Sequence, residues 1–191
     1  MKAYVGRPLL IIALAVFSLL LLFYLSFDTN KKSVSQNQVV SKASPGSPVR
    51  LMIPAININA DVEHVGVAPG GEMESPSNTV DVGWFKLGSR PGENGSAVIS
   101  GHFDGKNGEA GVFTNLHKLK KGDKLYIKDD KGTTTTFIVR ESRTYNPGYA
   151  EEVFNLNDHA HLNLVTCDGI WDKNKKNYTK RLVVFTDATH L

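Results

Sequence analysis

The chain has 191 residues and a single cysteine, Cys167, whose place in the sequence favours a chemical role. Cys167 ends the β-patterned run Leu-Val-Thr-Cys at 164–167. A second such run begins with Arg181, and a third, upstream, ends with His102. A thiolate can attack a carbonyl carbon, an imidazole can protonate a leaving group, and a guanidinium can stabilise the oxyanion. If strands bring these three side chains together, they form a site for nucleophilic catalysis.

Each of these residues also has an ordinary structural interpretation. A lone cysteine can be a buried small hydrophobe, and an arginine at the start of a strand can simply face water. Among the six histidines, His102 stands out because it follows an apolar strand and precedes a turn. His159 and His161 lie in a polar segment and are expected at the surface, and His117 is expected on the face of a short helix.

Beyond residue 48, runs of branched and aromatic residues alternate with Gly, Pro, Asn and Asp. Such runs are typical of β-strands separated by turns. We expect strands at 49–53, 60–65, 97–100, 124–127, 134–140, 162–166 and 182–185. Residues 129–132 predict a hairpin turn, and residues 112–119 predict one short helix. Seven or eight short strands with little helix indicate a mainly β fold, either a closed barrel or a sandwich.

The N-terminal residues 1–27 are predicted to be an uncleaved membrane anchor. The apolar run 8–27 is long enough, as a helix, to cross the roughly 30 Å hydrocarbon core of a bilayer, and it lacks the small-residue end of a cleaved signal peptide. Lys2 and Arg7 favour a topology with the N-terminus inside and the rest outside. Residues 28–48 are polar, lack apolar periodicity and are predicted to be a flexible linker. Residues 49–191 remain as the folded domain.

The composition is that of an ordinary globular protein, with 41% hydrophobic and 21% charged residues. The formal net charge is only +3. No dense stripe of Lys and Arg with interleaved aromatic residues is present, which argues against nucleic-acid binding.

Taken together, the three motifs resemble those of the sortases, which are membrane-anchored cysteine transpeptidases of Gram-positive-type cell surfaces. Sortases share a strand-end histidine, a Thr-Cys pair preceded by two apolar or small residues, and an arginine that opens the last strand. Here these are His102, the run 164–167 and Arg181. The resemblance extends over residues 49–189, and the segments 82–85, 91–102 and 112–123 are most similar to class F sortases.

The resemblance implies a closed β-barrel of about eight strands with one or two short helices. It implies a peptide groove with Cys167, His102 and Arg181 at its floor, and a role for Val165 and Thr166 in binding the peptide. Residues 141–160 and 168–180 would flank this groove.

The implied reaction is cleavage of a Leu-Pro-x-Thr-Gly-like sorting motif after its threonine, through a thioester with the cysteine. The surface protein is then transferred to a peptidoglycan precursor or another cell-wall amine.

No cofactor or metal is expected, because Asp104, Glu109, Glu151 and Glu152 do not form a tight acidic pattern of calcium ligands. Residues 28–48 hold no Asp-Pro-aromatic motif like the lid of pilin-polymerising sortases, which favours an open groove over a role in pilus assembly. Class F members often have glycine after the catalytic cysteine. Here that position is Asp168, a carboxylate that would disfavour the thiolate.

Two other functions fit the same residues. One is a Cys/His hydrolase, because water and amines compete for the same thioester. The other is a non-enzymatic anchored β-domain that binds peptide or cell wall, with a structural Cys167. An L,D-transpeptidase would need a Ser-x-Gly-Cys-type motif, which the sequence around Cys167 does not supply.

Overall fold

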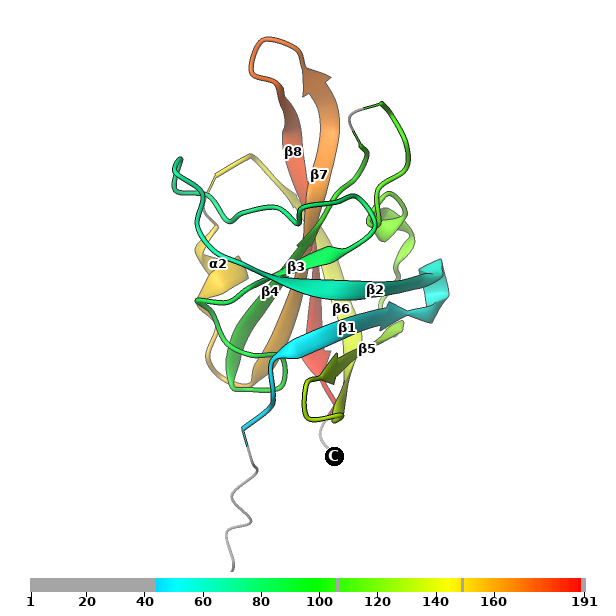
Figure 1. Ribbon diagram of the computed structural model, residues 1–191, viewed down its shortest axis with the longest axis vertical. Coiled ribbons are helices and arrows are strands. Elements are labelled where there is room, and N and C mark those ends of the chain that lie inside the picture. The colour runs from blue at the N-terminus through cyan, green and yellow to red at the C-terminus, as the bar shows by residue number, and fades with distance from the viewer. Residues whose placement is uncertain (1–43, 106, 149, 190–191) are drawn as a thin grey trace, which may run out of the picture. The chain divides into compact units, whose positions relative to one another are not determined.

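Eight strands close into a barrel in the part of the chain that this computed structural model describes, residues 44–105, 107–148 and 150–189 (Figure 1). Around the barrel the strands follow the order β1-β2-β3-β4-β7-β8-β6-β5, and β5 pairs with β1 to close it. The expectation of a mainly β fold is confirmed, and the closed barrel replaces the sandwich alternative. The predicted anchor 1–27 lies outside the described residues, as does most of the predicted linker.

The strands are β1 Pro48–Ile53, β2 Ile58–Val65, β3 Val82–Phe85, β4 Gly95–Gly101, β5 Lys124–Asp129, β6 Thr134–Tyr145, β7 Ala160–Asp172 and β8 Asn177–Ala188. The helical pieces are the 3₁₀ turns η2 Pro54–Ile56 and η3 Leu116–Lys118 and the single-turn helix α2 Glu151–Phe154. Among the described residues, no helix combines the length and the apolar character needed to cross a membrane.

The alternation of side chains along each strand separates two apolar clusters. Leu164 on β7 points into the barrel, where its cluster includes Ile99, Phe113 and Val184. Val165, the next residue, packs on the outer face against a second cluster that α2 covers, with Val98, Val153, Val183 and Phe185 as its buried members. Successive side chains of a strand point to opposite faces, so one sequence run serves both the core and the outer surface.

The strands extend beyond the predicted ones at several ends. Residues 168–180, expected to be mainly a loop, instead continue β7 and β8 into a long hairpin that projects from the barrel (Figure 1). The predicted helix at 112–119 is reduced to the short turn η3. The strand β3 was not predicted, because four residues with a central glycine, Gly83, show too little alternation to be recognised.

Two pairings of β7 position the segments that could carry chemistry, with Cys167 and Arg181 inside β7 and β8 rather than at the expected strand ends. β4 runs parallel to β7, and β8 runs antiparallel to it. The end of β4, the second half of β7 and the start of β8 therefore lie side by side.

Candidate active site

Cys167 and Arg181 are direct partners across the antiparallel pair β7–β8. Residues that lie opposite each other in such a pair project their side chains from the same face. Val165 and Val183, which share that face, belong to the outer cluster beneath α2. The thiol and the guanidinium therefore lie on the outside of the barrel, beside an apolar surface.

His102 follows directly after β4, at the same end of the barrel. In the parallel pair β4–β7, Ser100 lies opposite Val165, and the same register two residues further brings His102 level with Cys167. His102 Nε2 donates a hydrogen bond to the carbonyl oxygen of Pro76 at 2.9 Å. In the neutral ring this leaves Nδ1 as the basic nitrogen.

The loop that follows His102 packs closely on its backbone. Phe113 N donates to the His102 carbonyl oxygen at 2.9 Å, and the Phe113 ring is fully buried. A Cβ atom at Gly111 would lie only 2.2 Å from the same carbonyl oxygen. Only glycine fits this close approach, so residues 111–113 fix the position of the His102 backbone.

Three influences act on the thiol of Cys167. Partial burial raises its pKa, the positive charge of Arg181 lowers it, and the negative charge of Asp104 raises it. The net pKa lies above the usual value, so the resting thiol is mostly protonated at neutral pH. Asp104, rather than the predicted Asp168, is the carboxylate that disfavours the thiolate. The side chain of Asp168 accepts a hydrogen bond from Thr144 instead.

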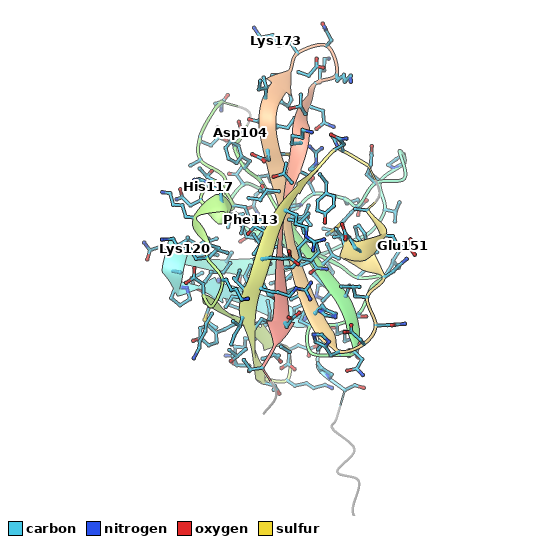
Figure 2. All side chains as sticks on the ribbon, turned by 180° about the vertical axis from the view of Figure 1, so that it is seen from behind. Asp104, Phe113, His117, Lys120, Glu151 and Lys173 are labelled. Carbon is cyan, nitrogen blue, oxygen red and sulfur yellow. The ribbon has the colours of Figure 1, made fainter. Side chains whose placement is uncertain are left out.

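Asp104 and Tyr178 link the loop after His102 to the β7–β8 hairpin. The Tyr178 hydroxyl donates a hydrogen bond to Asp104 Oδ2, and this bond, with burial, raises the pKa of Tyr178 to about 12. The Tyr178 ring also makes edge contacts with Phe103 and Trp171 at centroid distances of 5.7 and 5.3 Å. In Figure 2, Asp104 lies toward the end of the molecule where Lys173 marks the hairpin tip.

The Arg181 guanidinium is held by groups of its own hairpin. Nη2 donates to Asn177 Oδ1 at 2.7 Å, and Nη1 donates to the backbone oxygens of Lys180 and Tyr178 at 2.8 and 3.2 Å. These bonds fix the side chain next to Cys167. Sequence reasoning singled out Arg181 but missed Asn177 and Tyr178, which carry no signal until the hairpin pairing is known.

Thr166 and Val165 differ in where their side chains lie. Thr166 is buried and its hydroxyl donates to the carbonyl oxygen of Gly101 at 2.8 Å, which joins β7 to the end of β4. Val165 is half-buried on the outer face with Cys167. The structure therefore brings Val165 to the same face as the candidate nucleophile, whereas the Thr166 side chain serves the strand pairing.

His159 and His161 lie at the opposite end of β7 from Cys167. The expectation that both are surface residues is wrong for His161, whose side chain is only 1% exposed. The polar segment did not reveal this burial, because one of the two carboxylates that bind the ring, Asp187, lies 26 residues further along the chain.

Comparison with known proteins identifies the family of the chain. The sequence model described as the sortase domain matches residues 51–189. The chain therefore belongs to the sortase family, whose members are cysteine transpeptidases. The search of curated proteins gave no match.

Several solved sortase structures share the fold. Sortase C-1 from Actinomyces oris superposes with a TM-score of 0.61 at 25% identity, covering 76% of each chain. The pilus-related sortase C of group B Streptococcus gives 0.59 at 25% identity, covering 75% of this chain and 68% of that chain. Sortase A from Corynebacterium diphtheriae gives 0.60 at 22% identity, covering 78% of this chain and 64% of that chain.

Proposed function

We propose that this sortase cleaves a Leu-Pro-x-Thr-Gly-like sorting motif after its threonine and joins the new carboxyl end to an amine of the cell wall. The observation that carries the proposal is the direct pairing of Cys167 with Arg181 across β7 and β8, with His102 level with the cysteine at the end of β4. These are the side chains that acyl transfer through a thioester requires.

In the first half-reaction, the Cys167 thiolate attacks the carbonyl carbon of the threonine. Arg181 donates hydrogen bonds to the tetrahedral oxyanion. As the intermediate collapses, the C–N bond breaks and His102, as imidazolium, protonates the departing glycine amine. The products are a thioester between threonine and Cys167 and a free amino-terminal glycine fragment.

In the second half-reaction, an incoming amine attacks the thioester carbonyl. Neutral His102 accepts the proton of the amine, and the C–S bond breaks to release the thiolate of Cys167. A new amide bond then joins the surface protein to its acceptor. Water in place of the amine would give simple hydrolysis, so access of the amine decides the product.

The resting state holds little of the attacking form of the cysteine. Because burial and Asp104 raise the pKa of Cys167, only a small fraction of the chain holds a thiolate at neutral pH. The thiolate is the form that the first half-reaction needs.

The proposal extends to location and subclass. The apolar run 8–27 and the positive charges before it support a single-pass anchor with the catalytic domain outside the cell. The segments 82–85, 91–102 and 112–123 support a place nearest to class F. Sorting-motif proteins and a peptidoglycan-precursor amine are the corresponding partners.

Mass spectrometry of the full chain mixed with a Leu-Pro-x-Thr-Gly peptide, with and without a glycine-based amine, tests the proposal. We expect a threonine–amine product that is absent with Cys167→Ala. An acyl-enzyme mass on the wild type would identify Cys167 as the attacking residue.

The other outcomes are equally informative. Cleavage without ligation, at every amine tried, would make the protein a hydrolase. A chain that neither cleaves the peptide nor reacts with iodoacetamide at Cys167 would instead be a binding domain with a structural cysteine.

A further inference from the structure

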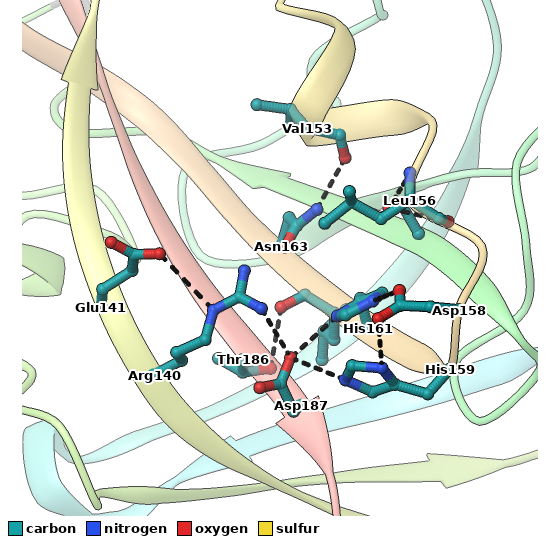
Figure 3. A network of polar contacts seen from close by, with 12 residues as sticks. Arg140, Glu141, Val153, Leu156, Asp158, His159, His161, Asn163, Thr186 and Asp187 are labelled. Atoms are coloured by element: carbon teal, nitrogen blue, oxygen red, sulfur yellow. Dashed lines mark hydrogen bonds and ion pairs between the residues drawn. The ribbon is translucent and has the colours of Figure 1, made fainter.

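A second cluster of titratable side chains lies at the end of β7 remote from Cys167. It consists of Asp158, His159 and His161, with Asp187 of β8 beside them (Figure 3). His161 lies six residues before Cys167 on the same strand, a separation of roughly 20 Å at 3.3 Å per residue. The proposed transpeptidation uses none of these side chains.

The two histidines form a pair at positions i and i+2, immediately at the start of β7. His161 is the second residue of β7, His159 directly precedes the strand, and the two ring centroids are 3.9 Å apart. His161 lies directly opposite Asp187 in the β7–β8 pairing. The strand pairing therefore holds His161 beside Asp187, and Asp158 and His159 join them from the segment before β7.

Asp187 faces one nitrogen of each ring. Its Oδ1 atom lies 2.8 Å from His161 Nδ1 and 3.4 Å from His159 Nε2. A neutral imidazole has a single N–H group. When Asp187 accepts both of these N–H groups, the remaining nitrogens, His161 Nε2 and His159 Nδ1, carry lone pairs.

Both remaining nitrogens face the second carboxylate. Asp158 Oδ1 lies 2.7 Å from His161 Nε2, and Asp158 Oδ2 lies 2.9 Å from His159 Nδ1. Lone pairs on nitrogen and on a carboxylate repel one another unless a cation lies between them. The ligand atoms of Asp158, His159 and His161 all lie within 4.8 Å of one another, so one divalent cation can contact all three groups at once.

We propose that Asp158, His159 and His161 bind a zinc-type divalent metal ion, with Asp187 as the carboxylate that orients the two histidines. Two imidazole nitrogens and a carboxylate are ligands that Zn²⁺ accepts, at about 2.0–2.2 Å. A hydrogen bond from the far ring nitrogen to a carboxylate is the usual support for a metal-bound histidine. The carboxylate of Asp158 offsets part of the charge of the ion, whereas that of Asp187 is shared with Arg140, whose Nη1 lies 3.4 Å from its Oδ1.

The exposure of the three proposed ligands fits a metal site. His161 is buried, but the side chains of His159 and Asp158 are 34% and 68% exposed. A solvent-open hollow lined by Asp158, His161, Arg140 and Glu141 gives the ion a route to the ligands. Since Asp158 is exposed, its carboxylate has room to move the few tenths of an ångström that the ion needs.

The expectation of no metal rested on Asp104, Glu109, Glu151 and Glu152, none of which belongs to this cluster. The Asp-His-x-His sequence at 158–161 escaped notice because Asp187, which orients both rings, lies 26 residues further along the chain.

Isothermal titration with Zn²⁺ alone, on the full chain without a histidine tag and after treatment with EDTA, tests the proposal. The chain carries Cys167→Ala so that the thiol cannot bind the ion. We expect one Zn²⁺ per chain. His159→Gln and Asp158→Asn are each expected to weaken binding by about 10- to 100-fold or more. Both residues are partly exposed, and circular dichroism will verify that the variants fold.

The matched control is His117→Gln, which removes a partly exposed imidazole outside the cluster and should leave the affinity unchanged. Bound Co²⁺ should give a visible absorption band that Zn²⁺ removes. Absence of Zn²⁺ binding would overturn the proposal, as would equal affinity in His159→Gln, Asp158→Asn and the control. Neither result would affect the proposed transpeptidation, which is measured separately.

Discussion

Cys167 lies between two charged side chains of opposite sign, and the balance between them controls its reactivity. Arg181 lowers the pKa of the thiol while Asp104 and burial raise it. Asp104 is itself held by Tyr178, so the loop after His102 and the hairpin after Cys167 act together on the thiol. The result is a thiol that is mostly protonated at neutral pH.

We predict that Asp104→Asn lowers the pKa of Cys167, because it removes the negative charge that opposes the thiolate. Alkylation by iodoacetamide at neutral pH should become about two- to tenfold faster, and its pH midpoint should move to lower pH. The rate of alkylation against pH measures both quantities.

Asp168→Asn is the matched control, since Asp168 is next to Cys167 in sequence but its carboxylate is bound by Thr144. It should leave the midpoint unchanged. A larger shift with Asp168→Asn than with Asp104→Asn would contradict the assignment.

Arg181→Ala should lower kcat for peptide cleavage by about 10²- to 10³-fold, the usual effect of removing one oxyanion donor. Arg181→Lys should restore only part of this loss, because an ammonium lacks the planar fork of donors. Single-turnover cleavage of the sorting peptide gives the rate. An unchanged kcat in Arg181→Ala would exclude this residue from catalysis.

The loop between β4 and β5 is the element that fixes His102. The carbonyl oxygen of His102 accepts a hydrogen bond from Phe113, and Gly111 lies against the same backbone. Small displacements of a catalytic group have large effects on rate. We therefore expect the packing of this loop, which positions the imidazole, to affect the rate strongly.

Gly111→Ala should therefore lower kcat by about 10²-fold, because its Cβ would force the His102 backbone to move. Gly70→Ala is the control, since a Cβ there would meet only the flexible side chain of Glu72. Comparison of kcat for the two variants, with circular dichroism for folding, checks the prediction. Equal activity of both would show that the loop adapts without moving His102.

The β5–β6 turn is organised by the carboxylate of Asp129. It accepts hydrogen bonds from the backbone N–H groups of Gly46, Lys131 and Thr133 at 2.8, 3.0 and 2.7 Å. Burial raises the pKa of Asp129, but these donors outweigh burial, and the net pKa lies below the usual value. The ionised carboxylate thus ties the segment before β1 to the turn.

Asp129→Ala should lower the free energy of unfolding by about 1–3 kcal/mol at neutral pH, since it leaves these donors without their acceptor. Because folding lowers the pKa of Asp129, the stabilisation that its carboxylate provides is fully present above the pKa that Asp129 has in the unfolded chain. It is lost as pH falls through the folded value. Urea unfolding at neutral and acidic pH should show the difference from wild type shrinking in acid. Glu72→Ala, at an exposed loop position, should show no such pH dependence.

At the scale of elements, the sequence predicted seven of the eight strands and the hairpin turn after Asp129. Clear alternation, as in Lys124–Asp129, marks a strand that packs on one side only. The hairpin residues 168–180 could not be assigned to strands from the sequence, because their glycine and lysines resemble a solvated loop. In the structure, pairing between β7 and β8 makes them strands. The charged surroundings of Cys167 were equally hidden, since Asp104 reaches it only through the β4–β7 pairing.

At the scale of the whole molecule, the barrel interior depends on a side chain from outside the strands. Phe113 lies in the loop between β4 and β5, yet it is fully buried among strand residues of the inner cluster. Its ring also packs against Gly101 at the end of β4, where a Cβ would lie 2.6 Å from it. The core and the candidate active site therefore share this residue.

Phe113→Ala should destabilise the protein by about 3–5 kcal/mol, the range for removing a buried phenylalanine. Phe103→Ala, which removes a half-buried ring of the same loop, should cost clearly less. Urea unfolding of both variants gives the comparison, and equal losses would contradict a role for Phe113 in the barrel core.

The strand order also has a consequence for how the candidate site is assembled. Among the described strands β8 comes last in the sequence, yet it lies in the sheet between β7 and β6. Without Asn177–Ala188, β7 would keep only β4 as a neighbour and β6 only β5, and the barrel would stay open between them. Arg181 belongs to that same strand. Closure of the barrel and completion of the candidate site are therefore one event.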